Sequence, residues 1–345
     1  RSTGEWLDAF RHEFEVLAGL RHPRLAEVHD FGATPDGRRY FTRDFIEGDD
    51  LAHAAADLDG PGLVALAIEV CRALAPLHSA ALIHGDLKPG NVVVSPDRVA
   101  HLIDFSFVRG LEEDAAARGT VRYLAPEVIE GRVADARVDL YALGVTLYEL
   151  LAGEPPFDGT AREVAAAHLG EARPRPRPRP ALAGEDPELL AGVAGIAGRL
   201  IERDPDRRFP DVGEVEAALG KLIGAEAEPD PLPLVPVIPF EGARSDELES
   251  LRRSLGARLA APDEGAAALH VVEGELGTGR TTVLRGIKWW AQLDEVPVLE
   301  VDCAGSGILG PLARLVEGAV DIVGRDGAAG ALGARLLGSL ERPEI

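Results

Sequence analysis

The stretch HGDLKPGN, residues 84–91, places a histidine, an aspartate, a lysine and an asparagine within eight residues. Moving a phosphoryl group onto a hydroxyl needs a group that accepts the hydroxyl proton, and cations that neutralise the transferred charge. Asp86 could accept the proton and Lys88 could reach the phosphate. Asn91 and the later Asp104 could hold Mg²⁺. The residue types and their spacing therefore predict phosphoryl-transfer chemistry.

Three predicted elements would position these side chains. Before residue 84, apolar residues recur at the spacing of one helix face and predict a long amphipathic helix: Leu63, Leu66, Ala67, Val70, Leu74 and Leu77. After it, NVVV and VAHLI flank the turn signal SPDR, which predicts a hairpin leading to Asp104. Residues 138–151 are apolar nearly all round and predict a helix buried at the centre of a domain.

The remaining pattern predicts further short elements. A helix is expected at 5–20, and two strands at 26–32 and 38–48 are joined by the turn TPDGR. Later helices are expected at 161–169, 187–202 and 211–223. Proline at every second position of RPRPRPRP, residues 173–180, favours an extended polyproline conformation. We interpret that stretch as a solvated surface loop in preference to a docking peptide.

Five motifs occur in order: HGDLKPGN, DFS, GTVRYLAPE, DLYALGVTLYELLAGEPPF and DPDRRF. Together they resemble a bacterial eukaryotic-like Ser/Thr protein kinase from residue 5 to about residue 222. One such motif alone would be weak, whereas five in register are specific. The resemblance implies an α+β protein-kinase-like fold, with a mainly α C-terminal lobe and a partial N-terminal lobe. It also implies ATP and Mg²⁺ as cofactors and Ser or Thr of proteins as acceptors.

The resemblance assigns a role to each residue of the first motif and to the aspartate of the second. Asp86 is the catalytic base and Lys88 contacts the γ-phosphate. Asn91 and Asp104 bind Mg²⁺. Lysine at position 88 is the choice of Ser/Thr kinases at that spacing.

Five other residues match structural positions of the family. Thr120 would position the substrate loop near Asp86, and Glu127 should pair with Arg208. Asp139 lies in an otherwise apolar helix and needs hydrogen-bond donors, which the family supplies from the backbone of the catalytic loop. Glu13 falls where the glutamate of the family's helix αC lies, the alternative being an ordinary exposed helical glutamate.

The segment that would regulate the kinase departs from the family pattern. Gly85 follows His84, where the family usually has an arginine that reads a phosphate on the activation loop. Between Asp104 and Thr120 the only hydroxyl is that of Ser106, and residues 112–114 are acidic. The two absences agree, so we predict that phosphorylation of this loop does not switch the kinase on.

Other departures concern the nucleotide site. DFS replaces DFG, so a residue with less backbone freedom stands after Phe105. No GxGxxG loop and no VAIK lysine precede Glu13, and we expect this stretch to be a fragment that binds ATP poorly and is itself inactive. Arg43 is an unusual charge at the back-pocket position before DFIEG.

A second candidate nucleotide site lies at GELGTGRT, residues 274–281, between the predicted strand LHVVEG and a predicted helix. Glycines here would aim backbone N–H groups at phosphates: Gly274, Gly277 and Gly279. Arg280 stands where the P-loop pattern has lysine, and Thr281 keeps the Mg²⁺-binding hydroxyl. Because a guanidinium is not equivalent to an ammonium, we expect nucleotide binding without efficient hydrolysis. The alternative is a glycine-rich turn without a ligand.

The sequence around this site resembles AAA/STAND-type regulatory ATPases. FEGARSDELESLRRSL matches the start of such domains, a polar helix is expected at 246–260, and VLEVDCAG fits their next strand. We therefore predict a truncated α/β P-loop NTPase domain at 240–345, a proline-rich acidic linker at 224–239 and the kinase domain at 1–223. The adjacent Trp289 and Trp290 are interpreted as packing residues.

Composition narrows the partners. The formal net charge of −22 argues against general binding to nucleic acid or anionic membranes. The sequence contains no apolar run of about 18 residues, so no membrane span is predicted. Two distant cysteines fit a reducing cytoplasm, and the nine histidines form no zinc-ligand spacing. Self-association through the regulatory module is a further expectation.

Three functions fit the pattern. We favour a Ser/Thr protein kinase tied to a regulatory ATPase module. The alternative is a non-catalytic pseudokinase/STAND scaffold. A small-molecule phosphotransferase is disfavoured, because GTVRYLAPE belongs to protein-substrate recognition in the family.

Overall fold

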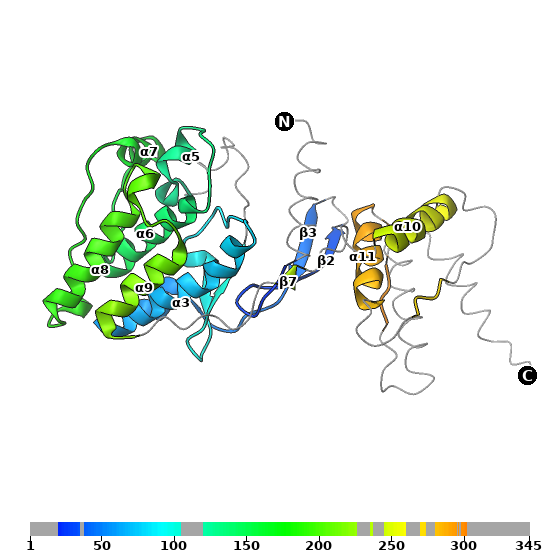
Figure 1. Cartoon of the computed structure of the whole chain (residues 1–345), viewed down its shortest axis with the longest axis horizontal. Coiled ribbons are helices and arrows are strands. Elements are labelled where there is room, and N and C mark those ends of the chain that lie inside the picture. Colours follow the sequence, from blue (N-terminus) through cyan, green and yellow to red (C-terminus); the bar gives the residue numbers. More distant parts are fainter. Residues whose placement is uncertain are drawn as a thin grey trace, which may run out of the picture. The chain divides into compact units, whose positions relative to one another are not determined.

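The computed structural model describes residues 20–34, 38–104, 120–225, 235–236, 245–259, 270–273, 280–294, 296 and 298–301. The chain divides into two compact units (Figure 1). The first comprises residues 1–28 and 43–237, and the second comprises residues 29–42 and 238–345. Of the helix predicted at 5–20, residues 5–19, which include Glu13, lie outside the described residues, and Leu20 belongs to a strand.

The first unit is mainly helical (Figure 1). Its helices are α2 (Leu51–Ala55), α3 (Gly60–Ser79), α5 (Pro126–Ile129), α6 (Arg137–Ala152), α7 (Ala161–Leu169), α8 (Pro187–Leu200) and α9 (Val212–Ile223). Helix α6 is buried on nearly every side and packs against α8, while α3 packs against α9. These contacts confirm the predicted central helix and the predicted amphipathic helix.

Helix ends follow from local sequence. Asp59 caps α3 by accepting a hydrogen bond from the backbone N–H of Gly62 at 2.8 Å. Thr160 and Glu163 form a reciprocal capping box at the start of α7. Helix α6 ends at Gly153, whose φ of 82° is a left-handed conformation that glycine adopts without strain. The boundaries predicted for the helices at 138–151, 161–169, 187–202 and 211–223 are confirmed to within two residues.

Helix α3 is long and apolar enough to cross a membrane by length and composition, and 67% of its most apolar window is buried inside the protein. It contacts α9, α8 and strand β6 (Ala100–Leu102). Such burial is typical of a core helix of a globular domain.

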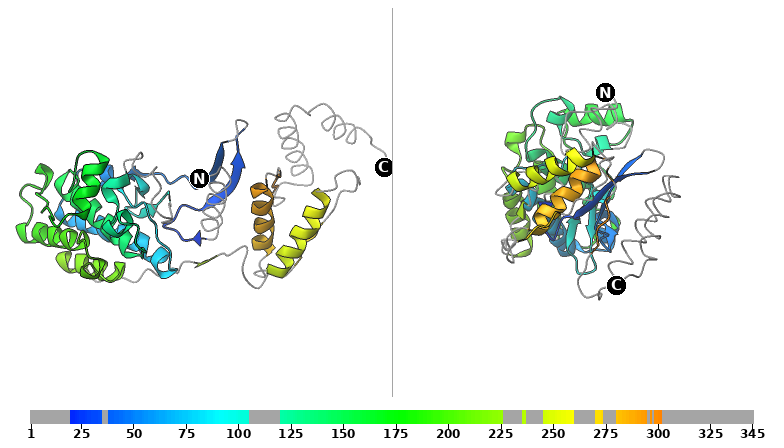
Figure 2. Two further views of the ribbon diagram at one scale, coloured as in Figure 1. Left: turned by 90° about the horizontal axis from the view of Figure 1, so that it is seen from above. Right: turned by 90° about the vertical axis from the view of Figure 1, so that its right-hand side faces the viewer.

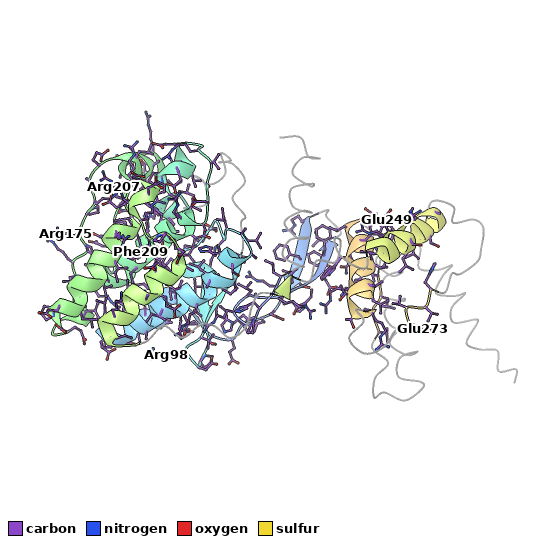
Figure 3. The ribbon with its side chains drawn as sticks, in the orientation of Figure 1. Arg98, Arg175, Arg207, Phe209, Glu249 and Glu273 are labelled. Atoms are coloured by element: carbon purple, nitrogen blue, oxygen red, sulfur yellow. The ribbon has the colours of Figure 1, made fainter. Side chains whose placement is uncertain are left out.

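A three-stranded antiparallel sheet lies beside these helices, in the order β4 (Asp49–Asp50), β5 (Val92–Val94) and β6 (Ala100–Leu102). Arg98, at the tip of the turn between β5 and β6, has φ of 67° (Figure 3). The predicted hairpin is confirmed. Short 3₁₀ helices occur at η1 (Pro89–Asn91), η2 (Thr120–Tyr123), η3 (Pro180–Leu182) and η4 (Pro205–Arg207).

The arginine-proline segment is an extended strap on the surface. Arg179 donates hydrogen bonds to the carbonyls of Ala55 and Ala56 at the end of α2, at 2.5 and 2.6 Å. Arg173 donates to the carbonyl of Gly170, just after α7, at 2.8 Å. Arg175, between these anchors, is exposed (Figure 3). The predicted extended surface loop is confirmed, and its outer arginines satisfy helix-end carbonyls.

Part of the predicted linker is ordered into a short strand. Strand β7 (Val235–Pro236) pairs antiparallel with β1 (Leu20–Arg21), so that Leu20 lies opposite Pro236. The end of the linker therefore returns to the first described residues of the chain.

The second unit combines a hairpin from early in the chain with two helices from much later in it (Figure 2). Strands β2 (Val28–Ala33) and β3 (Arg39–Arg43) form the hairpin, and α10 (Ser245–Leu259) packs against α11 (Arg280–Leu293). Trp289 is 1% exposed, and its indole Nε1 donates to the carbonyl of His29 at 2.9 Å. Lys288 Nζ lies 2.7 Å from a carboxylate oxygen of Asp30. The interpretation of Trp289 as a packing residue is confirmed.

Two predicted strands of the second unit are not formed in the part that the structure describes. Residues 270–273 and 298–301 adopt no regular strand there, and Val271, expected in a buried strand, is 66% exposed. The prediction of buried strands is therefore wrong for these residues. A strand is stabilised by a hydrogen-bonded neighbour, and within the described residues these segments have none.

Candidate active site

Helix α6 holds the loop that carries HGDLKPGN. The Asp139 carboxylate, 1% exposed, accepts hydrogen bonds from the backbone N–H groups of His84 and Gly85 at 2.8 and 2.9 Å. The His78 ring, near the end of α3, lies 2.9 Å from the same carboxylate. Gly85 has φ of 79°, which glycine tolerates at no steric cost. The predicted contact of Asp139 with the catalytic-loop backbone is thus present.

Asp86 is the centre of a compact polar cluster. Its Oδ2 accepts hydrogen bonds from Lys88 Nζ at 2.6 Å and from Asn91 Nδ2 at 2.9 Å. Asn91 Nδ2 also donates to the Asp86 carbonyl at 2.8 Å. The other carboxylate oxygen, Oδ1, is buried and has no hydrogen-bond partner among the described residues. A buried acceptor without a donor lowers the stability of a folded protein, so such an atom indicates a place where a donor from a ligand binds.

Asp104 lies beside this cluster, two residues after β6. Asn91 Nδ2 lies 3.5 Å from the Asp104 carbonyl, and the Asn91 carbonyl accepts from the backbone N–H of Ile103 at 2.9 Å. Asp104 has φ of 56°, an uncommon conformation for a residue with a side chain. Strained backbone of this kind concentrates at functional positions.

Asn91 and Asp104 fit a magnesium ion that is also bound by nucleotide phosphates. The side-chain nitrogen of Asn91 already donates to Asp86, which leaves the side-chain oxygen Oδ1 of Asn91 for a ligand. Within the described residues, no cluster of three His, Cys, Asp or Glu could hold a metal alone. Mg²⁺ ordinarily takes one or two protein oxygens and completes its octahedron with phosphates and water, so a two-residue site suits it.

Arg43, at the end of β3, reaches the same place. Its guanidinium Nη1 lies 2.7 Å from Oδ1 of Asp104. The sequence singled out Arg43 as an unusual charge but did not predict its partner, because the two residues are 61 positions apart.

A buried ion pair ties the substrate-loop segment to the helical core. Arg208 forms two hydrogen bonds with the Glu127 carboxylate at 2.6 and 2.7 Å, and both side chains are almost fully buried. The guanidinium also lies over the ring of Tyr141 at 4.8 Å from its centroid. The predicted Glu127–Arg208 pair is confirmed.

His78 and His84 help to hold the catalytic loop, and this role was not predicted from the sequence. Burial lowers the pKa of His84, which favours its neutral ring. His84 Nδ1 lies 3.3 Å from the backbone nitrogen of Asp86 and can accept its hydrogen. His78 supports Asp139 from α3. The spacing of histidine in LHSAALIHGD is the signal that could have suggested them.

A small apolar pocket adjoins the loop. Its lining includes Gly85 and Leu87 of the loop, residues 123–125, and Ala142 of α6. Tyr123 donates a hydrogen bond to Glu149 at 2.6 Å, and burial raises the pKa of its phenol. The pocket lies between the loop that carries Asp86 and the GTVRYLAPE segment.

The other predicted site residues lie elsewhere. Thr120 begins η2, and its side chain is not among those described. Glu13, Ser106, the acidic run at 112–114 and the glycines of the second site lie outside the described residues: Gly274, Gly277 and Gly279. Arg280 and Thr281 are exposed in the first turn of α11, in the second unit.

Comparison with known proteins gives a consistent assignment. A family model described as "Protein kinase domain" matches residues 1–209. Serine/threonine-protein kinase PknB of Mycolicibacterium smegmatis is 35% identical over 239 residues, which are 64% of this chain and 37% of that protein. PknF of Mycobacterium tuberculosis is 32% identical over 245 residues, 66% of this chain and 50% of that protein. PknJ of Mycobacterium bovis is 35% identical over 245 residues, 66% of this chain and 40% of that protein.

The chain spans half or less of the length of these relatives. The family model, by contrast, covers more than half of this chain and includes the loop with Asp86, Asp104 and the Glu127–Arg208 pair. The chain therefore belongs to the protein kinase domain family.

Proposed function

We propose that this chain carries the phosphoryl-transfer site of a Ser/Thr protein kinase, with Asp86 as the catalytic base. The observation that carries the proposal is the buried Oδ1 of Asp86, which has no partner among the described residues while Oδ2 is held by Lys88 and Asn91. A substrate hydroxyl donating to Oδ1 would be oriented for attack and would lose its proton to that oxygen.

The neighbouring residues complete the site. Lys88 would move from Asp86 toward the γ-phosphate as the nucleotide arrives, since its ammonium is the cation closest to the base. Asn91 and Asp104 would hold Mg²⁺ through their oxygens. When bound, the metal would neutralise charge on the phosphates. Protein substrates are supported by the relatives named above, each of which is a serine/threonine-protein kinase.

The test is phosphate transfer by the natural full-length protein, with Mg·ATP and either a generic basic protein or its own chain as acceptor. Asp86→Asn should abolish transfer onto Ser or Thr while leaving folding intact. Asp97→Asn is the matched control, because Asp97 lies in the exposed β5–β6 turn, where its carboxylate accepts a hydrogen bond from the Ser95 hydroxyl. A folded, nucleotide-bound protein that transfers no phosphate would instead support the non-catalytic scaffold.

We further propose that residues 240–345 begin an AAA/STAND-type regulatory ATPase domain. Helix α11 begins at Arg280, directly after the glycine-rich stretch, with Arg280 and Thr281 exposed in its first turn. The N-terminus of a helix favours phosphate groups. Binding of a fluorescent ADP analogue should weaken in Arg280→Ala and not in Arg253→Ala, an exposed arginine of α10. Equal binding by both variants would favour the turn without a ligand.

A further inference from the structure

Arg43 occupies one oxygen of the carboxylate that the proposed function assigns to the metal. The Nη1–Oδ1 distance of 2.7 Å is that of a charge-assisted hydrogen bond. The Arg43 side chain is 31% exposed and the Asp104 side chain 56% exposed. An ion pair this exposed is weak in itself, so a ligand can displace it.

Among the charged side chains of this region, Arg43 is the cation that pairs with Asp104. Lys88 is the cation of the catalytic loop, and its Nζ lies 2.6 Å from Oδ2 of Asp86. Asn91 contributes a neutral amide, which lies against the Asp104 carbonyl. Oδ1 of Asp104 is therefore matched to a guanidinium before any metal arrives.

We propose that Arg43 is a built-in competitor of the metal ion at Asp104: Mg²⁺ binds Oδ1 only when the guanidinium is displaced, and at Oδ2 it is repelled by the same cation. The inference rests on the proposed metal role of Asp104. A guanidinium and a divalent cation cannot share one carboxylate oxygen without strong repulsion. Arg43 thereby raises the metal concentration that the site requires.

The test measures metal affinity directly, with Mn²⁺ as a paramagnetic substitute for Mg²⁺ and the whole 345-residue chain as the protein. Free Mn²⁺ is followed by electron paramagnetic resonance, with and without ADP. Removing a cation that repels a divalent ion should tighten binding about tenfold in Arg43→Gln, even with the screening expected at exposed groups. Arg43→Leu provides a second neutral variant, and far-UV circular dichroism checks that each variant is folded.

Arg203→Gln is the matched control. Arg203 is also a partly exposed arginine, 2.9 Å from a carboxylate oxygen of Glu130, and its removal changes the net charge equally. It should leave Mn²⁺ affinity unchanged. An equal gain from Arg203→Gln would show a general charge effect and overturn the inference, as would an Arg43→Gln protein that binds Mn²⁺ no tighter than the unsubstituted chain.

Asp104→Asn separates the inference from the proposed function. If Asp104 is the metal ligand, this change should remove the gain in the Arg43→Gln background. A gain that persists would overturn both the competition and the metal role of Asp104. Loss of metal binding in Asp104→Asn without any gain from Arg43→Gln would overturn the competition alone.

Discussion

Replacing Asp139 with alanine removes the buried acceptor that holds the catalytic loop. Three donors lose their partner at once: the backbone N–H groups of His84 and Gly85 and the ring of His78. A buried donor left without an acceptor costs about 1–3 kcal/mol, so three of them, not fully additive, should cost about 3–6 kcal/mol. That is a large part of the roughly 5–15 kcal/mol by which domains are stable.

The asparagine variant should be milder, for a geometric reason. His84 and His78 both contact Oδ2 of Asp139, whereas Gly85 contacts Oδ1. If the asparagine amide places its oxygen at the Oδ2 position, the contacts with His84 and His78 are kept. The amide NH₂ group then faces the Gly85 N–H, so only this one contact is lost, because a donor meets a donor. Asp139→Asn should therefore cost about 1–3 kcal/mol.

Urea unfolding followed by far-UV circular dichroism measures both effects. Thr146→Val is the control on the same helix, because Thr146 is also 1% exposed but its hydroxyl has no hydrogen-bond partner among the described residues. That change should be neutral or stabilising by up to about 1 kcal/mol. A loss below about 1 kcal/mol in Asp139→Ala, or equal losses in Asp139→Ala and Thr146→Val, would refute the reasoning.

Three further changes have defined outcomes. Gly144→Ala should destabilise the first unit by about 1–3 kcal/mol in urea, since a Cβ there would lie 2.5 Å from the Leu200 Cβ; Gly195→Ala, with open space around it, should be neutral or stabilising by about 0.5–1 kcal/mol. Arg208→Met should cost about 3–5 kcal/mol, because it leaves a buried carboxylate unpaired; a calorimetric midpoint like that of the unsubstituted protein would contradict this. Burial lowers the pKa of His168 to about 4 from 6.5, so the unfolded chain takes up the proton first. The stability that depends on the neutral His168 ring is complete above pH 6.5 and is lost as the pH falls toward 4, at about 1.4 kcal/mol per pH unit. In His168→Gln, the free energy of unfolding measured in urea should depend less steeply on pH over this range.

The helical half of the fold could be predicted because its signals are local. The apolar pattern at 138–151 reports burial on every side, and α6 is buried as expected. A carboxylate inside such a pattern requires donors, and the resemblance to the kinase family implied that the catalytic-loop backbone supplies them to Asp139. SPDR between apolar runs predicted the β5–β6 hairpin for the same local reason.

The rest depends on contacts between distant segments. Arg43 meets Asp104 across 61 positions, and His78 meets Asp139 across the same separation. No period or turn signal encodes such a pairing, since it exists only after the helices and strands have packed. The same holds for the pairing of β1 with β7. It also holds for the strand predicted around Val271, because its apolar run does not say whether a neighbouring strand exists, and the described residues contain none beside it.

The hairpin β2–β3 has a consequence for where the protein can be divided. Because residues 29–42 belong to the second unit, the chain passes between the units three times, after residues 28, 42 and 237. A single proteolytic cut in the predicted linker would sever only the last passage, and α11 would still be held to the hairpin through Trp289 and Lys288. Truncation after Ile223 would keep the hairpin but strip it of these contacts. We therefore expect a kinase half trimmed at the linker to expose an uncovered strand pair and to aggregate more readily than the whole chain.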